Sequence, residues 1–415
     1  MTWTDPHATW QRLNEATAEL DPPLAILDLD AFDRNRIDIA RRAGGKPVRV
    51  ASKSLRVRRA IGQILTHQEF AGVLAYTLPE ALWLATASEV WEPLTDVVVG
   101  YPSVDRAAIA QLAADPQLCR YVTVMVDDVA HLDALNEACK RTGTRIRVCI
   151  DIDSSWRPQM PGKASIHVGA RRSPIHELDQ TISLVREILV RPGLSLVGLM
   201  FYESQIAGVG DKPPHQRVRG QLISLMQTAS GADLAKRRPA IVSAVRNELA
   251  DRNRPELEFV NAGGTGSLEL SSADPSVTEV TAGSGFFGPT LFDTYRHFHP
   301  EPASAFALPI VRRPGPGIVT VLGGGYIASG AHGPSRLPTP WLPEGLKLDP
   351  QEGAGEVQTP LKGKPADTLG IGDRVWLRHA KAGELAEHFN EIHLVRGYET
   401  TQAVPTYRGE GRCFL

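Results

Sequence analysis

The sequence has few cysteines, and they are scattered. Cys119, Cys139, Cys149 and Cys413 lie far apart, and no two of them form a C-x-x-C pair. This spacing argues against a zinc ribbon or a disulfide framework and is typical of proteins in a reducing compartment. The chain also lacks an apolar segment near its start and any run of about eighteen apolar residues. We therefore expect a soluble, cytoplasmic protein with no membrane partner.

An excess of charge of one sign is also missing. The 45 lysines and arginines nearly balance the 47 aspartates and glutamates, which leaves a formal net charge of −2. No basic run is long enough to follow a phosphate backbone, so we do not expect a nucleic-acid partner. With 42% hydrophobic and 22% charged residues, the composition is that of an ordinary globular protein and excludes a disordered, collagen-like or coiled-coil chain.

Short, β-branched apolar runs alternate with helical patterns through most of the chain. After an opening run, PPLAILDLDAF, these runs cover residues 46–52, 70–76, 96–102, 121–127, 145–153, 195–202, 257–263 and 276–283. Nearly continuous apolar runs are typical of parallel strands that are buried on both faces. Most of the gaps carry helical spacing, and the pattern at 129–143 stops at a glycine.

Eight strands, most of them followed by a helix, predict an α/β fold with a (β/α)8 TIM barrel over residues 31–300. The alternative is a doubly wound open sheet, which the absence of a G-x-G-x-x-G motif after an early strand disfavours. Residues 301–415 are rich in proline, glycine and hairpin patterns and predict a smaller β-rich C-terminal domain. We expect the strand within the N-terminal segment 1–30 to join this β-rich domain.

Reactive groups of a barrel gather at the C-terminal ends of its strands. Lys53 follows the first strand directly. A lysine amine in a desolvated site loses proton affinity and can form a Schiff base with a carbonyl group. The alternative is a lysine whose head lies in solvent. Asp151 and Asp153 alternate on the fifth strand, so only one can face the mouth, and we expect these carboxylates to cap loop N–H groups.

Two glycine clusters follow the seventh and eighth strands. They are Gly263, Gly264, Thr265, Gly266 and Ser267, and then Gly283, Ser284, Gly285 and Phe286. Glycines allow backbone N–H groups to converge on an anion, and the hydroxyl groups add donors. Barrels often bind phosphate in the loops after these two strands. A lysine and a phosphate cup together predict pyridoxal 5'-phosphate (PLP) as cofactor.

Several motifs together carry a family resemblance. Lys53, the segments MFYESQIAGVGD, NAGGTGS, AGSGFF and RHAKAGE, and the trailing β-rich region resemble the alanine-racemase-like (fold-type III) PLP enzymes. The chain is most similar to their D-threonine aldolase and D-serine dehydratase branch, often labelled amino-acid aldolase or deaminase. The resemblance extends from PPLAILDLDAF to NEIHLVRG, nearly the whole chain.

The resemblance implies roles for particular residues. Lys53 would be the lysine that holds PLP, and Tyr202 would lie against the cofactor. Arg157 lies near the position whose guanidinium approaches the phenolic oxygen of the cofactor. The phosphate-holding residues that the resemblance implies are Gly263, Gly264, Thr265 and Gly266, helped by Gly283, Ser284, Gly285 and Phe286. It also implies a homodimer in which the second domain closes the active site.

Two positions depart from the family pattern. Thr281 stands nearest to the place where alanine racemases have an arginine against the pyridine nitrogen, which weakens a racemase assignment. His379 begins the motif in which the branch binds a divalent metal through His-x-Asp or His-x-Cys. Here the third residue is Lys381, which cannot replace either ligand.

Three interpretations of His379 stay open. Glu384, His388 or His393 would complete a rearranged metal site, so metal binding is left undecided. Without a metal, His379 would act as an acid or base on the β-hydroxyl group of the substrate. In the third interpretation it is a strand histidine bonded to backbone.

These observations predict a PLP-dependent lyase that acts on a small amino-acid substrate. The first expectation is an aldolase that cleaves a β-hydroxy-α-amino acid, D-threonine-like by resemblance, to glycine and an aldehyde, with Lys53 and His379 as catalytic residues. The alternative is a dehydratase that ends in a keto acid and ammonia, with Lys53 as the base. A racemase, a non-catalytic PLP-binding protein and a sugar-phosphate aldolase without PLP are further alternatives.

Overall fold

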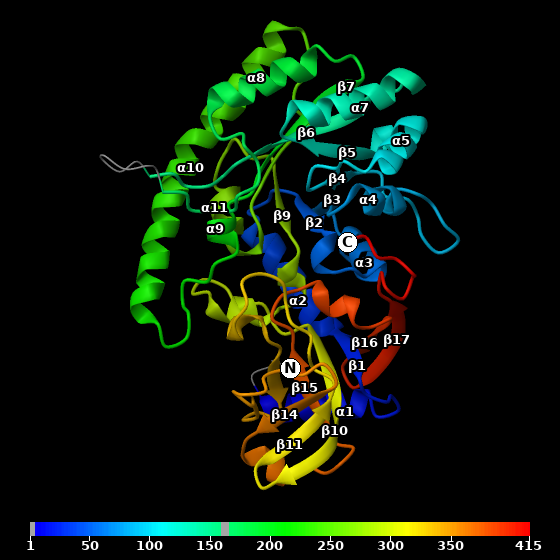
Figure 1. Ribbon diagram of the computed structural model, residues 1–415, viewed down its shortest axis with the longest axis vertical. Coiled ribbons are helices and arrows are strands. Elements are labelled where there is room, and N and C mark those ends of the chain that lie inside the picture. Colours follow the sequence, from blue (N-terminus) through cyan, green and yellow to red (C-terminus); the bar gives the residue numbers. More distant parts are fainter. Residues whose placement is uncertain (1–4, 159–165) are drawn as a thin grey trace. The chain divides into compact units, whose positions relative to one another are not determined.

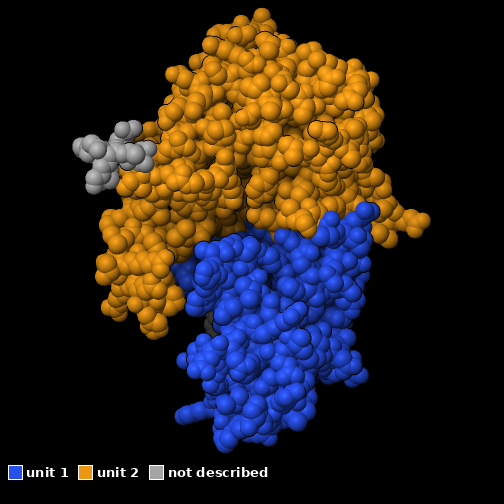
Figure 2. Space-filling model, in the orientation of Figure 1, with its two compact units in different colours: residues 1–38, 54–63, 283–413 blue, residues 39–53, 64–282, 414–415 orange. Residues whose placement is uncertain are grey.

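The computed structural model describes residues 5–158 and 166–415. Contacts divide the chain into two compact units, each assembled from several stretches of sequence. Unit 1 contains the residues up to 38, residues 54–63 and residues 283–413, and unit 2 contains residues 39–53, 64–282 and 414–415 (Figure 2).

Unit 2 is built on a closed barrel of eight parallel strands. Each strand pairs with the next along the chain, and the last strand pairs with the first. The strands are β2 (Val48–Ala51), β3 (Phe70–Ala75), β4 (Val97–Val99), β5 (Val122–Val126), β6 (Ile146–Ile152), β7 (Leu194–Phe201), β8 (Phe259–Ala262) and β9 (Glu279–Ala282) (Figure 1). The predicted barrel is confirmed, and the open-sheet alternative is wrong because the two outer strands meet. Seven of the observed strands are shorter than the predicted runs, and β7 has the predicted length, shifted by one residue.

Helices precede and separate these strands, as the periodicity predicts. They are α2 (Leu29–Arg42), α3 (Arg58–Leu65), α4 (Leu78–Leu84), α5 (Arg106–Ala114), α6 (Pro116–Tyr121), α7 (Val129–Thr142), α8 (Leu178–Leu189), α9 (Ser204–Ala207), α10 (Arg217–Asp251) and α11 (Leu268–Ser272). Helix α7 starts where the Asp128 side chain accepts the Ala130 N–H and ends at Gly143, whose φ of +74° is left-handed.

A cluster of apolar side chains fills the middle of the barrel. Its members touch one another although they come from six different strands, so they point inward from the wall. They are Leu74, Val98, Met125, Cys149, Val197, Met200 and Phe259. Gly198 leaves the room that Phe259 needs, because a Cβ at this position would lie 2.3 Å from the aromatic ring.

An ionic network lies across the seam where β2 meets β9. The guanidinium of Arg49, 2% exposed, donates to Glu279 at 2.7 Å and to Asp96 at 2.8 Å. Asn261 donates to Glu279 at 2.8 Å, and Thr281 donates to Asn261 at 2.9 Å. Burial acts against the charge of Arg49, but the two carboxylates outweigh it and raise its pKa. Both ends of the barrel wall are thus tied to one buried cation.

Unit 1 contains a nine-stranded sheet. The order is β13-β14-β11-β10-β1-β16-β17, with β15 paired to both β10 and β12. The strands are β1 (Leu24–Asp28), β10 (Ser304–Gly315), β11 (Ile318–Leu322), β12 (Thr339–Leu342), β13 (Lys347–Leu348), β14 (Gln358–Lys362), β15 (Arg374–Arg378), β16 (Glu391–Arg396) and β17 (Glu399–Pro405) (Figure 1). The opening strand of the chain therefore lies in this sheet, antiparallel to β10 and parallel to β16.

Helix α1 (Pro6–Ala16) packs its apolar side on the same sheet. Leu13 of this helix shares a buried cluster with Ile26, Ala305 and Trp376. The indole of Trp376 donates to Asn14 at 2.8 Å, so the helix is held by a polar contact as well as by apolar burial. Over the residues that the structure describes, no helix combines the length and the apolar character that a membrane crossing requires.

We expect the Arg49→Met substitution to lower the free energy of unfolding by about 3–5 kcal/mol, because it leaves a buried carboxylate without its partner. Denaturant unfolding measures this loss. The matched control is Lys140→Met, which removes an exposed pair with Glu137 in which the side chains are 62% and 58% exposed. That control should cost less than about 1 kcal/mol. Equal, small losses for the two variants would contradict the structural role of Arg49.

Candidate active site

Lys53 lies where β2 leaves the barrel. Residues Ser52–Ser54 form a short 3-10 turn directly after the strand, so the lysine follows the C-terminal end of the barrel wall. Its ammonium donates to the hydroxyl of Tyr101 at 3.0 Å and lies 5.5 Å from the centre of that ring. Tyr101 itself comes two residues after β4. The side chain of Lys53 is exposed, and its ammonium is nevertheless bonded to a neighbouring barrel loop.

A second cation joins this group. The guanidinium of Arg172 lies 5.4 Å from the ring of Tyr101 and 5.5 Å from the ring of Tyr202, which follows β7. Burial works against ionisation of Tyr101, but the charge and the hydrogen bond of Lys53, with the charge of Arg172, lower its pKa. Burial raises the pKa of Tyr202 to about 12. Tyr101 therefore ionises more readily than an ordinary phenol, and Tyr202 less readily.

Asp151, on β6, has a buried carboxyl group among charged neighbours. Burial raises its pKa to about 7, and the charges of Asp127 and Asp153 act in the same direction while Arg172 opposes them. Its carboxyl can therefore hold or release a proton near neutral pH. The expectation of a capping role holds for Asp153, which accepts from the backbone N–H of Ser155 at 2.8 Å. Asp151 belongs instead with the charged groups around Arg172.

A buried carboxylate, that of Glu203, anchors the glycine-rich turn after β8. Glu203 accepts hydrogen bonds from Ser267, at 2.9 Å, and from Ser271, and it pairs with Arg238 at 3.3 Å. Ser267 in turn accepts the backbone N–H of Gly264 at 3.1 Å. This network fixes the backbone of the turn without using a side chain at its surface.

Two glycines of this turn leave space that a side chain would fill. Gly263 has a left-handed φ of +87°. A Cβ at Gly264 would lie 3.0 Å from Ala207 and 3.1 Å from the ring of Tyr202. The backbone at Gly264 therefore lies directly beside the ring of Tyr202. The turn continues as a 3-10 segment, Thr265–Ser267, which includes Gly266. The N–H groups of Gly263 and Gly264 donate to Phe201 and Ser267, so what these two glycines offer an anionic group is close approach to the backbone.

The other predicted cluster follows β9 and belongs to unit 1. Ser284, Gly285 and Phe286 form a 3-10 turn after Gly283, and the carbonyl of Phe286 accepts from Asn35 at 3.1 Å. Their expected part in phosphate binding stays a prediction.

Arg157 lies apart from the contacts around Lys53. Its guanidinium pairs with Asp153 at 2.5 Å and donates to Ser155 at 3.2 Å. The arginine that faces the two phenol rings is Arg172, from the same long stretch between β6 and α8. Sequence reasoning missed Tyr101 and Arg172, although both follow barrel strands; the strand-end rule that found Lys53 points to Tyr101 as well.

His379 and Lys381 follow β15 in unit 1. The imidazole of His379 is buried against the edge of Phe287, with 6.5 Å between ring centres. Among the residues 5–158 and 166–415, no three His, Cys, Asp or Glu side chains are placed to hold a metal ion.

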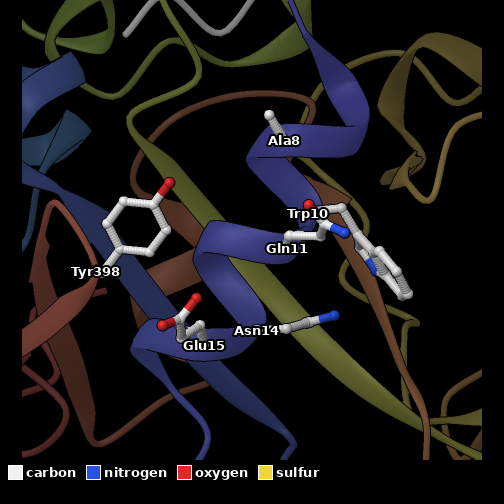
Figure 3. A pocket seen from close by; sticks show the side chains of 6 residues that line it. All are labelled: Ala8, Trp10, Gln11, Asn14, Glu15 and Tyr398. Carbon is white, nitrogen blue, oxygen red and sulfur yellow. The ribbon is translucent and has the colours of Figure 1, made fainter.

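A separate hollow of about 560 Å³ lies on α1 in unit 1. It is lined by Ala8, Trp10, Gln11, Asn14, Glu15 and Tyr398 (Figure 3). None of the predicted site residues lines this hollow.

A closed parallel barrel combined with a strand-rich second unit is the architecture of the alanine racemase fold, and sequence comparison agrees with this class. The alanine racemase N-terminal domain model matches residues 27–289, and the chain belongs to this family. It is 26% identical over 272 residues to a 3-hydroxy-D-aspartate aldolase of Paracoccus denitrificans, over 65% of this chain and 61% of that protein. It is 23% identical over 279 residues to a D-threonine aldolase of Arthrobacter sp, over 65% of this chain and 62% of that protein. The matched region thus spans less than two thirds of either relative.

Solved structures share the fold over nearly the whole chain. A D-threonine aldolase from Filomicrobium marinum superposes with a TM-score of 0.75 at 21% identity, covering 94% of this chain and 97% of that one. D-threo-3-hydroxyaspartate dehydratase from Delftia sp. HT23 superposes with a TM-score of 0.69 at 20% identity, covering 93% and 97%. The predicted combination of a barrel with a strand-rich second region is confirmed.

Asp151 gives the site a testable pH dependence. Its pKa is about 7 in the folded protein against an ordinary 3.8, so between these values the folded state holds a proton that the unfolded chain has lost. Stability should therefore fall as the pH rises through this window. Asp151→Asn lacks the titrating carboxyl, so its stability should not show this decrease. The free energy of unfolding of the variant, relative to that of the wild type, should therefore rise with pH. Denaturant unfolding across the window measures the difference, and two parallel pH profiles would contradict the assignment.

Proposed function

We propose that the protein is a PLP-dependent lyase that cleaves a β-hydroxy-α-amino acid to glycine and an aldehyde. The observation that carries the proposal is the position of Lys53. This residue follows the C-terminal end of the first barrel strand, and its ammonium donates to the hydroxyl of Tyr101. The names of the relatives, a 3-hydroxy-D-aspartate aldolase and a D-threonine aldolase, support this reaction and a D-configured substrate.

The residues around Lys53 fit PLP. The bare backbone of Gly263 and Gly264 offers a cradle in which a Cβ would intrude, and it lies against the ring of Tyr202. We propose that these glycines, with Thr265 and Gly266, hold the phosphate. The second cluster, Gly283, Ser284, Gly285 and Phe286, is proposed to assist.

Each neighbour of Lys53 has a proposed task. When bound, PLP supplies an electron sink for the charge that is left on the α-carbon. Lys53 would hold PLP through its amine, and Tyr101, which accepts a hydrogen bond from that amine and has a lowered pKa, would take up or return its proton. Arg172 holds positive charge between the two phenol rings. Asp151 exchanges a proton near neutral pH.

The roles of Arg157 and His379 are narrower proposals. Arg157 is engaged with Asp153, so we assign the charge beside the cofactor to Arg172 in its place. His379 stays the proposed base for the β-hydroxyl group, supported by its place at the start of the RHAKAGE motif. Its pKa, which burial lowers to about 3, makes it a weak base. We also propose a cytoplasmic homodimer, on the scattered cysteines and the family resemblance.

A specific observation favours a dehydratase as the second candidate. The same fold occurs in a D-threo-3-hydroxyaspartate dehydratase. Loss of the α-proton followed by expulsion of the β-hydroxyl would give a keto acid and ammonia from the same class of substrate. The two reactions differ in which bond to the α-carbon breaks.

Purified protein supplied with PLP should show an absorbance band that borohydride bleaches, because the Lys53 amine forms a reducible link to the aldehyde. Lys53→Ala should lose this band, while Lys140→Ala, an exposed lysine on α7, should keep it. An unchanged band in Lys53→Ala would contradict the assignment of the lysine, and no band in any variant would contradict the cofactor.

Product analysis separates the two reactions. D- and L-β-hydroxy-α-amino acids are offered to the PLP-loaded protein, and glycine with aldehyde is measured against keto acid with ammonia. We expect glycine and aldehyde from the D-substrates. Keto acid as the main product would replace the aldolase by the dehydratase, and no turnover of any substrate would contradict both.

A further inference from the structure

The turn after β15 carries an imidazole without a hydrogen-bond partner. His379 is 3% exposed, and neither ring nitrogen bonds to another group in the described part of the chain. Buried polar atoms nearly always have a partner. In its neutral form this ring offers one nitrogen lone pair as a metal ligand.

A divalent metal needs several ligands, and this turn offers one. Lys381 stands two residues after His379, at the position where the family resemblance implies an aspartate or a cysteine. An ammonium has no lone pair to donate, and its charge repels a cation. No cluster of three suitable side chains exists in the described stretches 5–158 and 166–415 that would replace the missing ligand.

The alternative ligands near this turn are engaged elsewhere. Glu384 accepts the backbone N–H of Ser329 at 2.9 Å. His388 stacks on Tyr326, with 4.3 Å between ring centres. His393 lies on β16 and faces Glu391 at 3.5 Å. The rearranged metal sites considered from the sequence are therefore not assembled among these residues.

We propose that the His379–Lys381 turn works without a divalent metal and that the ammonium of Lys381 supplies the positive charge there. Lys381 lies on the same turn as the unpartnered ring, and its Nζ approaches the carbonyl of Ser329 at 3.5 Å. An ammonium attracts an anionic oxygen, such as a carboxylate or a developing alkoxide, without needing a ligand set. The attraction of a substrate oxygen by Lys381 rests on the proposed function. The inference that the turn binds no divalent metal is independent of that function.

Restoring the missing ligand tests the proposal. Lys381→Asp creates a His-x-Asp pair, and Lys381→Cys creates a His-x-Cys pair. We expect the wild type to carry no stoichiometric Mn²⁺ or Zn²⁺ after purification, by elemental mass spectrometry. Each variant should bind Mn²⁺ or Zn²⁺ at least about 100-fold more tightly than the wild type in calorimetric titration.

The control for charge alone is Lys347→Asp, at an exposed lysine of β13. It should leave metal affinity at the wild-type level, and adding His379→Ala to Lys381→Asp should remove the acquired site. Stoichiometric metal in the wild type that a chelator removes would overturn the proposal. Two folded Lys381 variants that bind no better than the wild type would overturn the assignment of the missing ligand to Lys381. Metal content is measured without turnover, so failure here is distinct from failure of the proposed lyase activity.

Discussion

The guanidinium of Arg49 crosses the seam at which the barrel closes. A parallel barrel forms only when its last strand returns to its first, and here β9 pairs with β2. Arg49 on β2 binds Glu279 on β9 inside that seam, and it also binds Asp96 just before β4. A buried guanidinium paired with a buried carboxylate tolerates few other arrangements, since Arg49 or Glu279 left alone would be costly. The closing register of the barrel depends on this contact.

The position of the candidate site follows from that closure. Lys53 comes four residues after Arg49, so the register that places Arg49 in the interior also places the lysine past the strand end. The loops after β4, β6 and β7 then bring Tyr101, Arg172 and Tyr202 into one group. Their charges are interdependent, because two cations next to two phenols lower the pKa of one phenol while burial raises that of the other. The pKa of each phenol therefore depends on all four of these side chains together.

The sequence was informative where a local rule applied. Apolar runs located all eight barrel strands, and the rule that barrels react at strand ends located Lys53 and the glycine turns. It named Arg157 and missed Arg172, because both lie in the long stretch between β6 and α8 and only the folded loop decides which one reaches the phenol rings. It also misjudged Asp151. Alternation along a strand gives the direction of a side chain, but the burial and the neighbouring charge of Asp127 depend on packing between strands.

The most direct test of the account is to locate the cofactor link by mass spectrometry. The protein is incubated with PLP, reduced with borohydride and digested, and the peptide that carries the pyridoxyl group is sequenced. The account predicts the modification on Lys53, at the end of the first barrel strand. Stoichiometric modification of any other lysine, with Lys53 unmodified, would contradict the assignment of the site.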